Sequence, residues 1–294
     1  MNGNNAGMAL KEIMRRAMDE IWNRRIGFVG HEKTVKYKAD PKDLVTDADL
    51  ASQKIFVRKL KEGFPGYGIV AEENGFSKKC TLRGRKLFFT VDPLDGTKAF
   101  GRKQSQGFGP MLSLSTESQV ISAFVGDAMT MELYYYRPDS KKVHRLNFGD
   151  HQYERLSIDP KRPLSDQYVL LRDNPFDLPG LYNCVAQSVK HGGVFKDIEI
   201  AGGGIGTGMA RLWKGEVGAY VIKAGIQTPW DLLPIWGISE KLGFRWMTFD
   251  EPSSRWVKRE VKPSMFMTKF EDPSIIVHKS RINEFKAGAR RYLI

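Results

Sequence analysis

The segment VDPLDGTKAFGR at residues 91–102 places two carboxylates three positions apart at the end of an apolar run. Pro93 and Leu94 separate Asp92 from Asp95, and Gly96 and Thr97 follow directly. One interpretation is an ordinary turn, because Asp, Pro and Gly are common turn residues. The other is a cation site that also binds phosphate, because hard cations prefer carboxylate oxygens. The segment alone does not decide between the two.

Three further acidic features occur along the chain: VTDADL with Asp47 and Asp49, VAEENG with Glu72 and Glu73, and TPWDLL with Asp231. Each feature also has a purely structural interpretation. Thr46 and Asp49 have the spacing of a capping box for a following helix. The two glutamates fit a solvated strand end, and Asp231 fits a helix N-cap. Taken singly, none of these features establishes a functional site.

The elements predicted around these residues bring most of the carboxylates to strand or helix ends. An amphipathic helix is predicted within residues 8–26, a polar loop with Pro41 follows, and a second helix runs from Thr46 to before Pro65. Residues 67–74 and 86–92 are predicted strands that run into acidic ends. Ligands gather at the carboxyl ends of strands in open α/β sheets, so a shared site at this edge is expected.

The rest of the chain continues the alternation of strands and helices. Residues 111–137 predict a three-stranded meander, and a polar, proline-containing stretch at 150–166 predicts a boundary between two halves, 1–150 and 151–294. In the second half, strands are predicted at 167–171, 217–222, 244–249 and 274–278, and helices at 178–190, 205–214, 231–242 and 280–291. This alternation predicts a layered α/β fold.

Composition narrows the class of protein and of partner. The 294 residues carry 46 basic and 34 acidic side chains, a net charge of +12, which favours anionic partners, although an inert basic surface is the alternative. No apolar run approaches the roughly 20 residues of a membrane helix, and the N-terminus lacks the layout of a secretory signal. Cys80 and Cys184 fit no metal or disulfide framework, so a cytoplasmic location is expected.

The acidic motifs, in this order, resemble the inositol monophosphatase superfamily of metal-dependent, often lithium-sensitive phosphatases. The matching residues are Asp49, Glu72-Glu73, DPLDGT at 92–97 and the Trp-Asp pair at 230–231. The runs FPGYGIVAEE and GGIGTGMARLWKGEVGAYV are also similar to the family. The resemblance spans roughly residues 8–245 and implies an α-β-α-β-α sandwich of two α/β halves. It also implies a small phosphorylated metabolite as substrate.

The resemblance implies roles for individual residues. The ligands of two or three Mg²⁺ ions would be Glu72, Asp92, Asp95, Asp231 and the backbone carbonyl of Leu94. Asp49 and Thr97 would orient the attacking water, with Glu72 as a further catalytic residue. Substrate contacts would come from Asp95, Gly96, Thr97, Gly206, Thr207, Lys223 and Asp231. Because neighbouring residues of a strand face opposite sides, only one of Glu72 and Glu73 can point fully into the site, and the resemblance selects Glu72.

The chain departs from the family pattern at two positions. Pro234 stands where a small residue is common, and we expect it to be tolerated in a first helical turn. Lys223 stands near the place of a hydroxyl-accepting glutamate, so it either suits a second anionic group on the substrate or points to solvent. Lys98 after DPLDGT is also seen in relatives that hydrolyse 3′-phosphoadenosine phosphates and histidinol phosphate.

Several functions therefore remain open from the sequence. The expected function is Mg²⁺-dependent hydrolysis of a phosphate monoester, with inositol monophosphate as the most frequent family label. The enzymatic alternatives are a 3′(2′),5′-bisphosphate nucleotidase or another sugar or histidinol phosphatase. The non-enzymatic alternative is binding to RNA or a transcription complex, which the basic surface would favour. A homodimer is expected from the family.

Overall fold

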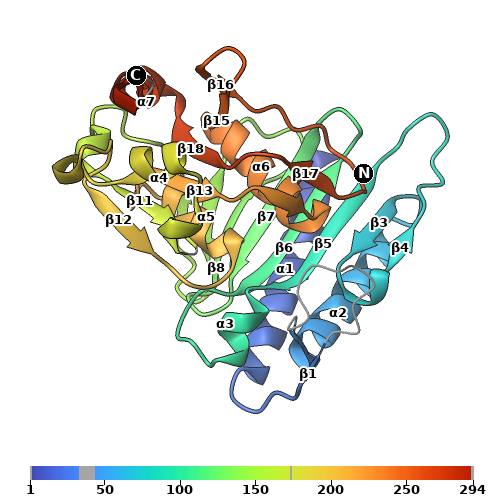
Figure 1. Cartoon of the computed structure of the whole chain (residues 1–294). Helices are drawn as coiled ribbons and strands as arrows, with labels where there is room; N and C mark the ends of the chain where they lie inside the picture. Colours follow the sequence, from blue (N-terminus) through green and yellow to red (C-terminus); the bar gives the residue numbers. More distant parts are fainter. Residues whose placement is uncertain (1, 33–43, 173, 293–294) are drawn as a thin grey trace.

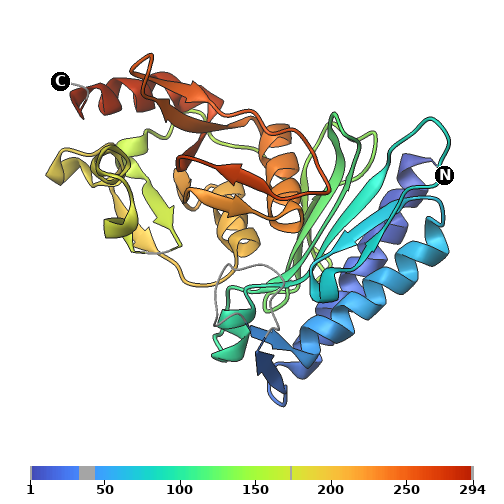
Figure 2. The same ribbon diagram turned by 45° about the vertical axis from the view of Figure 1, so that its right-hand side comes forward.

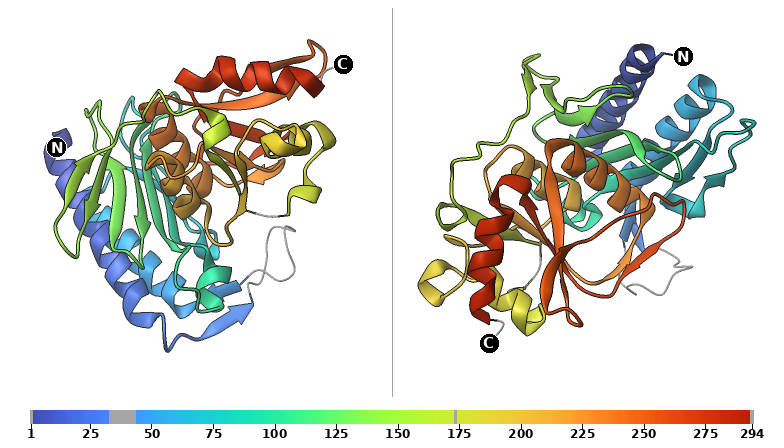
Figure 3. Two further views of the ribbon diagram at one scale, coloured as in Figure 1. Left: turned by 90° about the vertical axis from the view of Figure 1, so that its left-hand side faces the viewer. Right: turned by 90° about the horizontal axis from the view of Figure 1, so that it is seen from above.

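The computed structural model describes residues 2–32, 44–172 and 174–292, and it has five layers (Figures 1 and 2). Helices α1 (Gly3–Arg24) and α2 (Asp47–Gly63) cover the outer face of an eight-stranded sheet. Helices α5 (Ile205–Trp213) and α6 (Pro229–Leu242) fill the space between this sheet and a six-stranded sheet. Helices α4 (Gly180–Ala186) and α7 (Ile282–Ala289) cover the second sheet's other face (Figure 3). The predicted α-β-α-β-α sandwich is confirmed.

The eight-stranded sheet carries the first part of the candidate site. Its strands, in spatial order, are β10 (Tyr153–Arg155), β9 (His144–Asn147), β8 (Glu132–Tyr136), β7 (Val120–Asp127), β6 (Gly109–Ser115), β5 (Phe88–Asp95), β3 (Gly68–Ala71) and β4 (Ser77–Lys78). Strands β3 and β5 pair in parallel, and β5 to β10 form an antiparallel meander. The predicted meander at 111–137 is confirmed. Strand β10 lies inside the stretch predicted as a boundary.

The six-stranded sheet is built from the second part of the chain. In spatial order its strands are β12 (Asp197–Ile200), β11 (Tyr168–Leu171), β13 (Ala219–Ile222), β18 (Ser274–His278), β15 (Phe244–Asp250) and β16 (Arg255–Lys258). Two small sheets pair β1 (Gly30–Glu32) with β2 (Leu44–Thr46) and β14 (Gly225–Gln227) with β17 (Thr268–Phe270). The four strands predicted for this half are confirmed, whereas β12 and β16 were not predicted.

Two predicted elements are shorter in the structure, and one predicted segment falls outside it. The helix predicted at 178–190 ends at Ala186, because the next residues turn extended and the Val189 N–H donates to the Phe195 carbonyl at 2.7 Å. The strand predicted at 67–74 ends at Ala71, and Glu73–Gly75 form a 3₁₀ turn. The predicted loop around Pro41 lies outside the described residues.

Burial explains why the helices occupy these layers. The buried side chains of α1 recur at helical spacing along one face, which packs on the outer face of the first sheet. Helix α6 instead buries side chains on all sides, as expected for a helix enclosed between two sheets: Leu232, Leu233, Ile235, Trp236 and Ile238. No helix in the described part of the chain is long and apolar enough to cross a membrane. Cys80 and Cys184 are free thiols.

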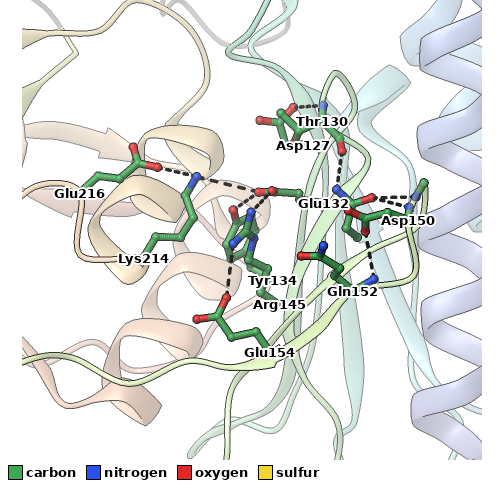
Figure 4. Close-up of polar contacts among 12 residues, drawn as sticks. Asp127, Thr130, Glu132, Tyr134, Arg145, Asp150, Gln152, Glu154, Lys214 and Glu216 are labelled. Carbon is green, nitrogen blue, oxygen red and sulfur yellow. Dashed lines mark hydrogen bonds and ion pairs between the residues drawn. The ribbon is translucent and has the colours of Figure 1, made fainter.

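A buried polar cluster joins the end of α5 to the edge of the first sheet (Figure 4). The Glu132 carboxylate is 8% exposed and accepts hydrogen bonds from the Tyr134 hydroxyl and the Arg145 guanidinium. The ammonium of Lys214 lies 3.9 Å from the same carboxylate and 2.6 Å from that of Glu216. Every charge in this cluster has an opposite partner, so the cluster is structural.

Candidate active site

Three carboxylates from distant parts of the chain converge beyond the carboxyl end of β5. Asp92 and Asp95 come from the end of β5, and Asp231 is the third residue of α6. One oxygen from each lies within 4.8 Å of the others. Asp92 is only 2% exposed and Asp95 6%. A set of hard oxygen donors this close together fits a divalent cation such as Mg²⁺.

Backbone N–H groups fix the orientation of two of these carboxylates. The Leu94 N–H donates to Asp92 Oδ1 at 2.9 Å. At the start of α5, the Ile205 and Gly206 N–H groups donate to the two oxygens of Asp95, at 3.1 and 2.6 Å. A side chain on Gly204 would place its Cβ 2.3 Å from Asp95 Oδ2, so this close approach requires glycine.

The pKa values of Asp92 and Asp95 are raised because these carboxyl groups are buried close to other carboxylates. Burial, followed by the charges of Glu72, Asp231 and Asp95, raises the pKa of Asp92 well above its usual range. Burial and the charge of Asp231 raise the pKa of Asp95 to about 6, against the opposing effect of Arg172 and the Gly206 and Ile205 N–H groups. Repulsion of this kind is relieved by a bound cation, so the donor set and its electrostatics both fit a metal site.

Asp49 and Thr97, expected to orient a water, are in contact beside this cluster. The Thr97 hydroxyl oxygen lies 2.9 Å from Asp49 Oδ1 and 3.0 Å from the Leu94 carbonyl oxygen, so its proton can go to either acceptor. The other oxygen of Asp49 accepts from the Thr46 N–H at 2.8 Å and from the Thr46 hydroxyl, which completes a capping box at the start of α2. Asp49 is fully buried. Asp49 therefore caps helix α2 and also contacts Thr97 beside the acidic cluster.

Only one of Glu72 and Glu73 lines the cavity, as expected, but the reason is not the expected alternation of side chains along a strand. They follow β3 in a turn instead of alternating along a strand, so the strand argument was wrong. Glu72 lines the cavity that contains the three aspartates. The backbone N–H and carbonyl of Glu73 are both bonded to the Gln53 side chain, each at 2.8 Å, which fixes the turn. The chain is thereby directed so that Glu72 faces the cavity.

The cavity has a volume of about 440 Å³, and its lining includes both expected and unexpected residues. Gly96, Thr97, Lys98 and Leu94 line it as expected. Sequence reasoning gave no site role to six other lining groups: Ala99, Arg102, Arg172, Gly202-Gly203, Thr228 and Trp230. Arg172 directly follows β11, so the rule that ligands gather at strand ends was the available signal for it.

Three residues expected to contact substrate do not line this cavity. Gly206 is buried, and its N–H is used by Asp95. The Thr207 hydroxyl donates to the Gly204 carbonyl at 3.2 Å. Lys223 lines a neighbouring cavity of about 170 Å³, which shares Arg172 and Asp231 with the larger one. Its ammonium pairs with Asp177 at 2.9 Å. Their roles in substrate binding stay predictions.

Helix α6 begins earlier than expected, which changes the position of Pro234. Thr228 is the N-cap and Pro229 the first helical residue, so Asp231 is not the N-cap of its structural interpretation. Pro234 then lies beyond the first turn, contrary to the expectation. Because proline has no N–H, it cannot donate to the carbonyl of Trp230, which lines the cavity.

The chain is similar to known proteins in both sequence and fold. Residues 5–252 match the model of the inositol monophosphatase family. An inositol-1-monophosphatase of Bacillus subtilis is 29% identical over 43% of this chain and 46% of its own length. A Nus factor SuhB of Xylella fastidiosa is 30% identical over 31% of each chain. These alignments thus span less than half of either relative.

Solved structures with the same fold cover nearly the whole chain. A calcium-bound IMPase family protein from Staphylococcus aureus has a TM-score of 0.71 at 19% identity and covers 97% of this chain and 95% of its own. An IMPase/NADP phosphatase complexed with Mg²⁺ and phosphate has a TM-score of 0.66 at 18% identity, over 96% of this chain and 94% of its own. Together with the family match over most of the sequence, this establishes that the chain belongs to the inositol monophosphatase family.

Proposed function

We propose that the protein is a Mg²⁺-dependent phosphatase that hydrolyses a phosphate monoester of a small metabolite. The observation that carries this proposal is the convergence of Asp92, Asp95 and Asp231 beside the Thr97–Asp49 pair. The family match supports phosphatase chemistry, and a structural neighbour complexed with Mg²⁺ and phosphate supports the choice of ion. Glu72, Asp92, Asp95, Asp231 and the Leu94 carbonyl would hold the metal.

Mg²⁺ bound there would supply positive charge that polarises the phosphate and lowers the pKa of water. The protein's own groups would position the reacting water and the phosphate. If Thr97 donates its proton to Asp49, the lone pairs of its hydroxyl oxygen are available to accept a hydrogen bond from a water on the cavity side. The backbone of Gly96 and Thr97, at the start of helix α3 (Thr97–Gly101), would bind phosphate oxygens.

The neighbouring cavity is where we place the rest of the substrate. Arg172 borders both cavities, and Lys223 borders the smaller one. Both carry positive charge, although Asp177 partly neutralises Lys223. We therefore propose that a substrate with a second anionic group is preferred over inositol 1-phosphate. Lys223→Glu should lower kcat/KM for 3′-phosphoadenosine 5′-phosphate and raise it for inositol 1-phosphate. A tenfold wild-type preference for inositol 1-phosphate would contradict this assignment.

A phosphate-release screen tests the proposed activity directly. Inositol 1-phosphate, 3′-phosphoadenosine 5′-phosphate, fructose 1,6-bisphosphate and histidinol phosphate would each be assayed with Mg²⁺ and with excess EDTA. We expect turnover of at least one substrate with Mg²⁺ and none with EDTA. Absence of turnover for the whole set, or turnover that EDTA leaves unchanged, would contradict the proposal.

The similarity to Nus factors gives a second candidate function, binding to RNA or a transcription complex. The net charge of +12 supports it. An electrophoretic shift with RNA at physiological salt, measured beside phosphate release, separates the two functions. We further propose a homodimer, a cytoplasmic location, and a division of the chain near residue 150. Light scattering tests the dimer.

A further inference from the structure

A third cavity, of about 490 Å³, opens on the face of the first sheet opposite to the polar cluster around Glu132. It is lined by Lys11 of α1, Tyr135 and Arg137 at the end of β8, Lys142, and His144 and Tyr153 at the starts of β9 and β10. We call it the Tyr153 cavity. It shares no lining residue with the candidate active site, which lies at the end of β5, three strands from β8 and farther from β9 and β10.

Positive charge dominates the Tyr153 cavity. Among the described residues, no carboxylate lies within ion-pair distance of Lys11, Arg137 or Lys142. The neighbouring Arg145 is excluded from this set, because its guanidinium is turned to Glu132 and Glu154 (Figure 4). Cations that converge on a concave surface without counter-ions attract an anion, and each hydrogen bond to a phosphate oxygen is charge-assisted.

Aromatic rings form one wall of the same cavity. The His144 and Tyr153 rings are stacked, with centroids 4.9 Å apart and planes at 21°. Tyr153 remains 59% exposed, so part of its ring is available for a further planar group. Lys11 lies 5.4 Å from the centroid of the Tyr135 ring, which brings a cation and a π-surface together. Exposed rings beside cations are the combination that binds nucleobases together with phosphates.

His144 supplies an independent sign of a missing partner. Its Nδ1 atom is buried and has no hydrogen-bond partner in the described part of the chain, which is uncommon for a buried polar atom. Partial burial and the charges of Lys142, Arg137, Arg155 and Lys11 lower the pKa of His144, so the imidazole is neutral at pH 7. A neutral imidazole can donate or accept one hydrogen bond through this nitrogen.

We propose that the Tyr153 cavity binds a nucleoside phosphate, with the base stacked on Tyr153 and the phosphates held by Lys11, Arg137 and Lys142. A purely anionic ligand would leave the exposed ring unused, and a purely aromatic one would leave the three cations without a partner. This site is separate from the phosphatase site, so its occupancy does not depend on the proposed function.

Isothermal titration calorimetry tests the site in the full chain, with EDTA present to keep metal out of the acidic cavity. The probes are ATP, inorganic tripolyphosphate, adenosine and a single-stranded deoxyadenosine decamer. We expect ATP to bind at least tenfold more tightly than tripolyphosphate and adenosine. Equal binding of ATP and tripolyphosphate would overturn the proposal, because the ring would contribute nothing. A decamer that binds tenfold more tightly than ATP would overturn it in favour of a nucleic-acid site.

Variants locate the binding. Tyr153→Ala and Lys142→Glu should each weaken ATP binding at least tenfold, whereas Tyr153→Phe should keep it within twofold because the stacking surface remains. The matched controls are Phe266→Ala and Lys262→Glu, which change an exposed ring and an exposed cation elsewhere and should leave binding unchanged. ATP binding that survives both Tyr153→Ala and Lys142→Glu would place it elsewhere and refute the assignment.

Discussion

At the scale of single residues, the candidate site is a set of carboxylates that the fold holds together against their mutual repulsion. Asp92 and Asp95 are buried beside Asp231, and their pKa values are raised by burial and by the charges of neighbouring carboxylates, that of Asp231 in both cases. In the metal-free protein the ionised forms are therefore destabilising at neutral pH. Destabilising groups of this kind are retained where function requires them. We therefore expect these carboxylates to be needed for activity and to lower the stability of the metal-free protein.

The first prediction follows from this cost. Asp92→Asn removes one buried charge, and the amide oxygen can still accept from the Leu94 N–H. In EDTA at pH 7 we expect the variant to melt at least about 3 °C above the wild type, the shift that roughly 1 kcal/mol produces in a large domain. Mg²⁺ should then raise the melting temperature of the wild type more than that of the variant. Differential scanning calorimetry with and without Mg²⁺ measures both effects. Equal or lower stability of the variant in EDTA contradicts the repulsion argument.

The second prediction concerns the Thr97 hydroxyl, which contacts Asp49 and the Leu94 carbonyl. Thr97→Ala removes the group that would position water, so we expect kcat to fall about a hundredfold, the lower range for a positioned proton-transfer group. Thr97→Ser keeps the hydroxyl and should retain most of the activity. Steady-state kinetics of both variants, with melting temperatures as a check on folding, test this. Equal loss in the two variants would show that the methyl group, and not the hydroxyl, is what matters.

At the scale of elements, sequence reasoning succeeded where the pattern was long or strongly apolar. Helices α1 and α2 and the central strands β6, β7 and β8 bury continuous faces, so their periodicity predicted them. The edge strands β9 and β10 have half-buried or exposed residues throughout, so no apolar alternation marks them. They form because β8 offers an edge to pair with, which is information from the tertiary fold.

The third prediction tests the cluster that joins α5 to this sheet edge. Glu132→Gln removes a buried carboxylate and leaves the Arg145 guanidinium without its main counter-ion, so we expect unfolding in urea to cost about 2 kcal/mol less. The control is Glu154→Gln, whose carboxylate is 57% exposed and pairs with the same arginine at 3.3 Å. It should change stability by less than about 0.5 kcal/mol. Similar losses of unfolding free energy in the two variants would show that burial of the Glu132 carboxylate adds nothing to its contribution to stability.

At the scale of the whole molecule, the site is assembled from segments that lie far apart in the sequence. The acidic motifs could be predicted because their residue types and order are distinctive. Gly202-Gly203 could not, because they reach the cavity only through the packing of α5 and the second sheet against β5, whereas Arg172 was missed although it directly follows β11. Lys223 was predicted from its position in the chain, but its pairing with Asp177 depends on a turn that the sequence did not indicate.

Mg²⁺-dependent phosphate release by the wild type, Asp92→Asn and Asp231→Asn, on the best substrate of the screen, is the most direct test of the proposed metal site. The two aspartates come from different halves of the chain, and their oxygens lie within 4.8 Å of one another. If they hold one metal site, each substitution should lower kcat/KM by about a thousandfold or more, and EDTA should abolish wild-type activity. Full activity in EDTA, or an Asp231→Asn variant as active as the wild type, would contradict a catalytic metal site shared by these aspartates.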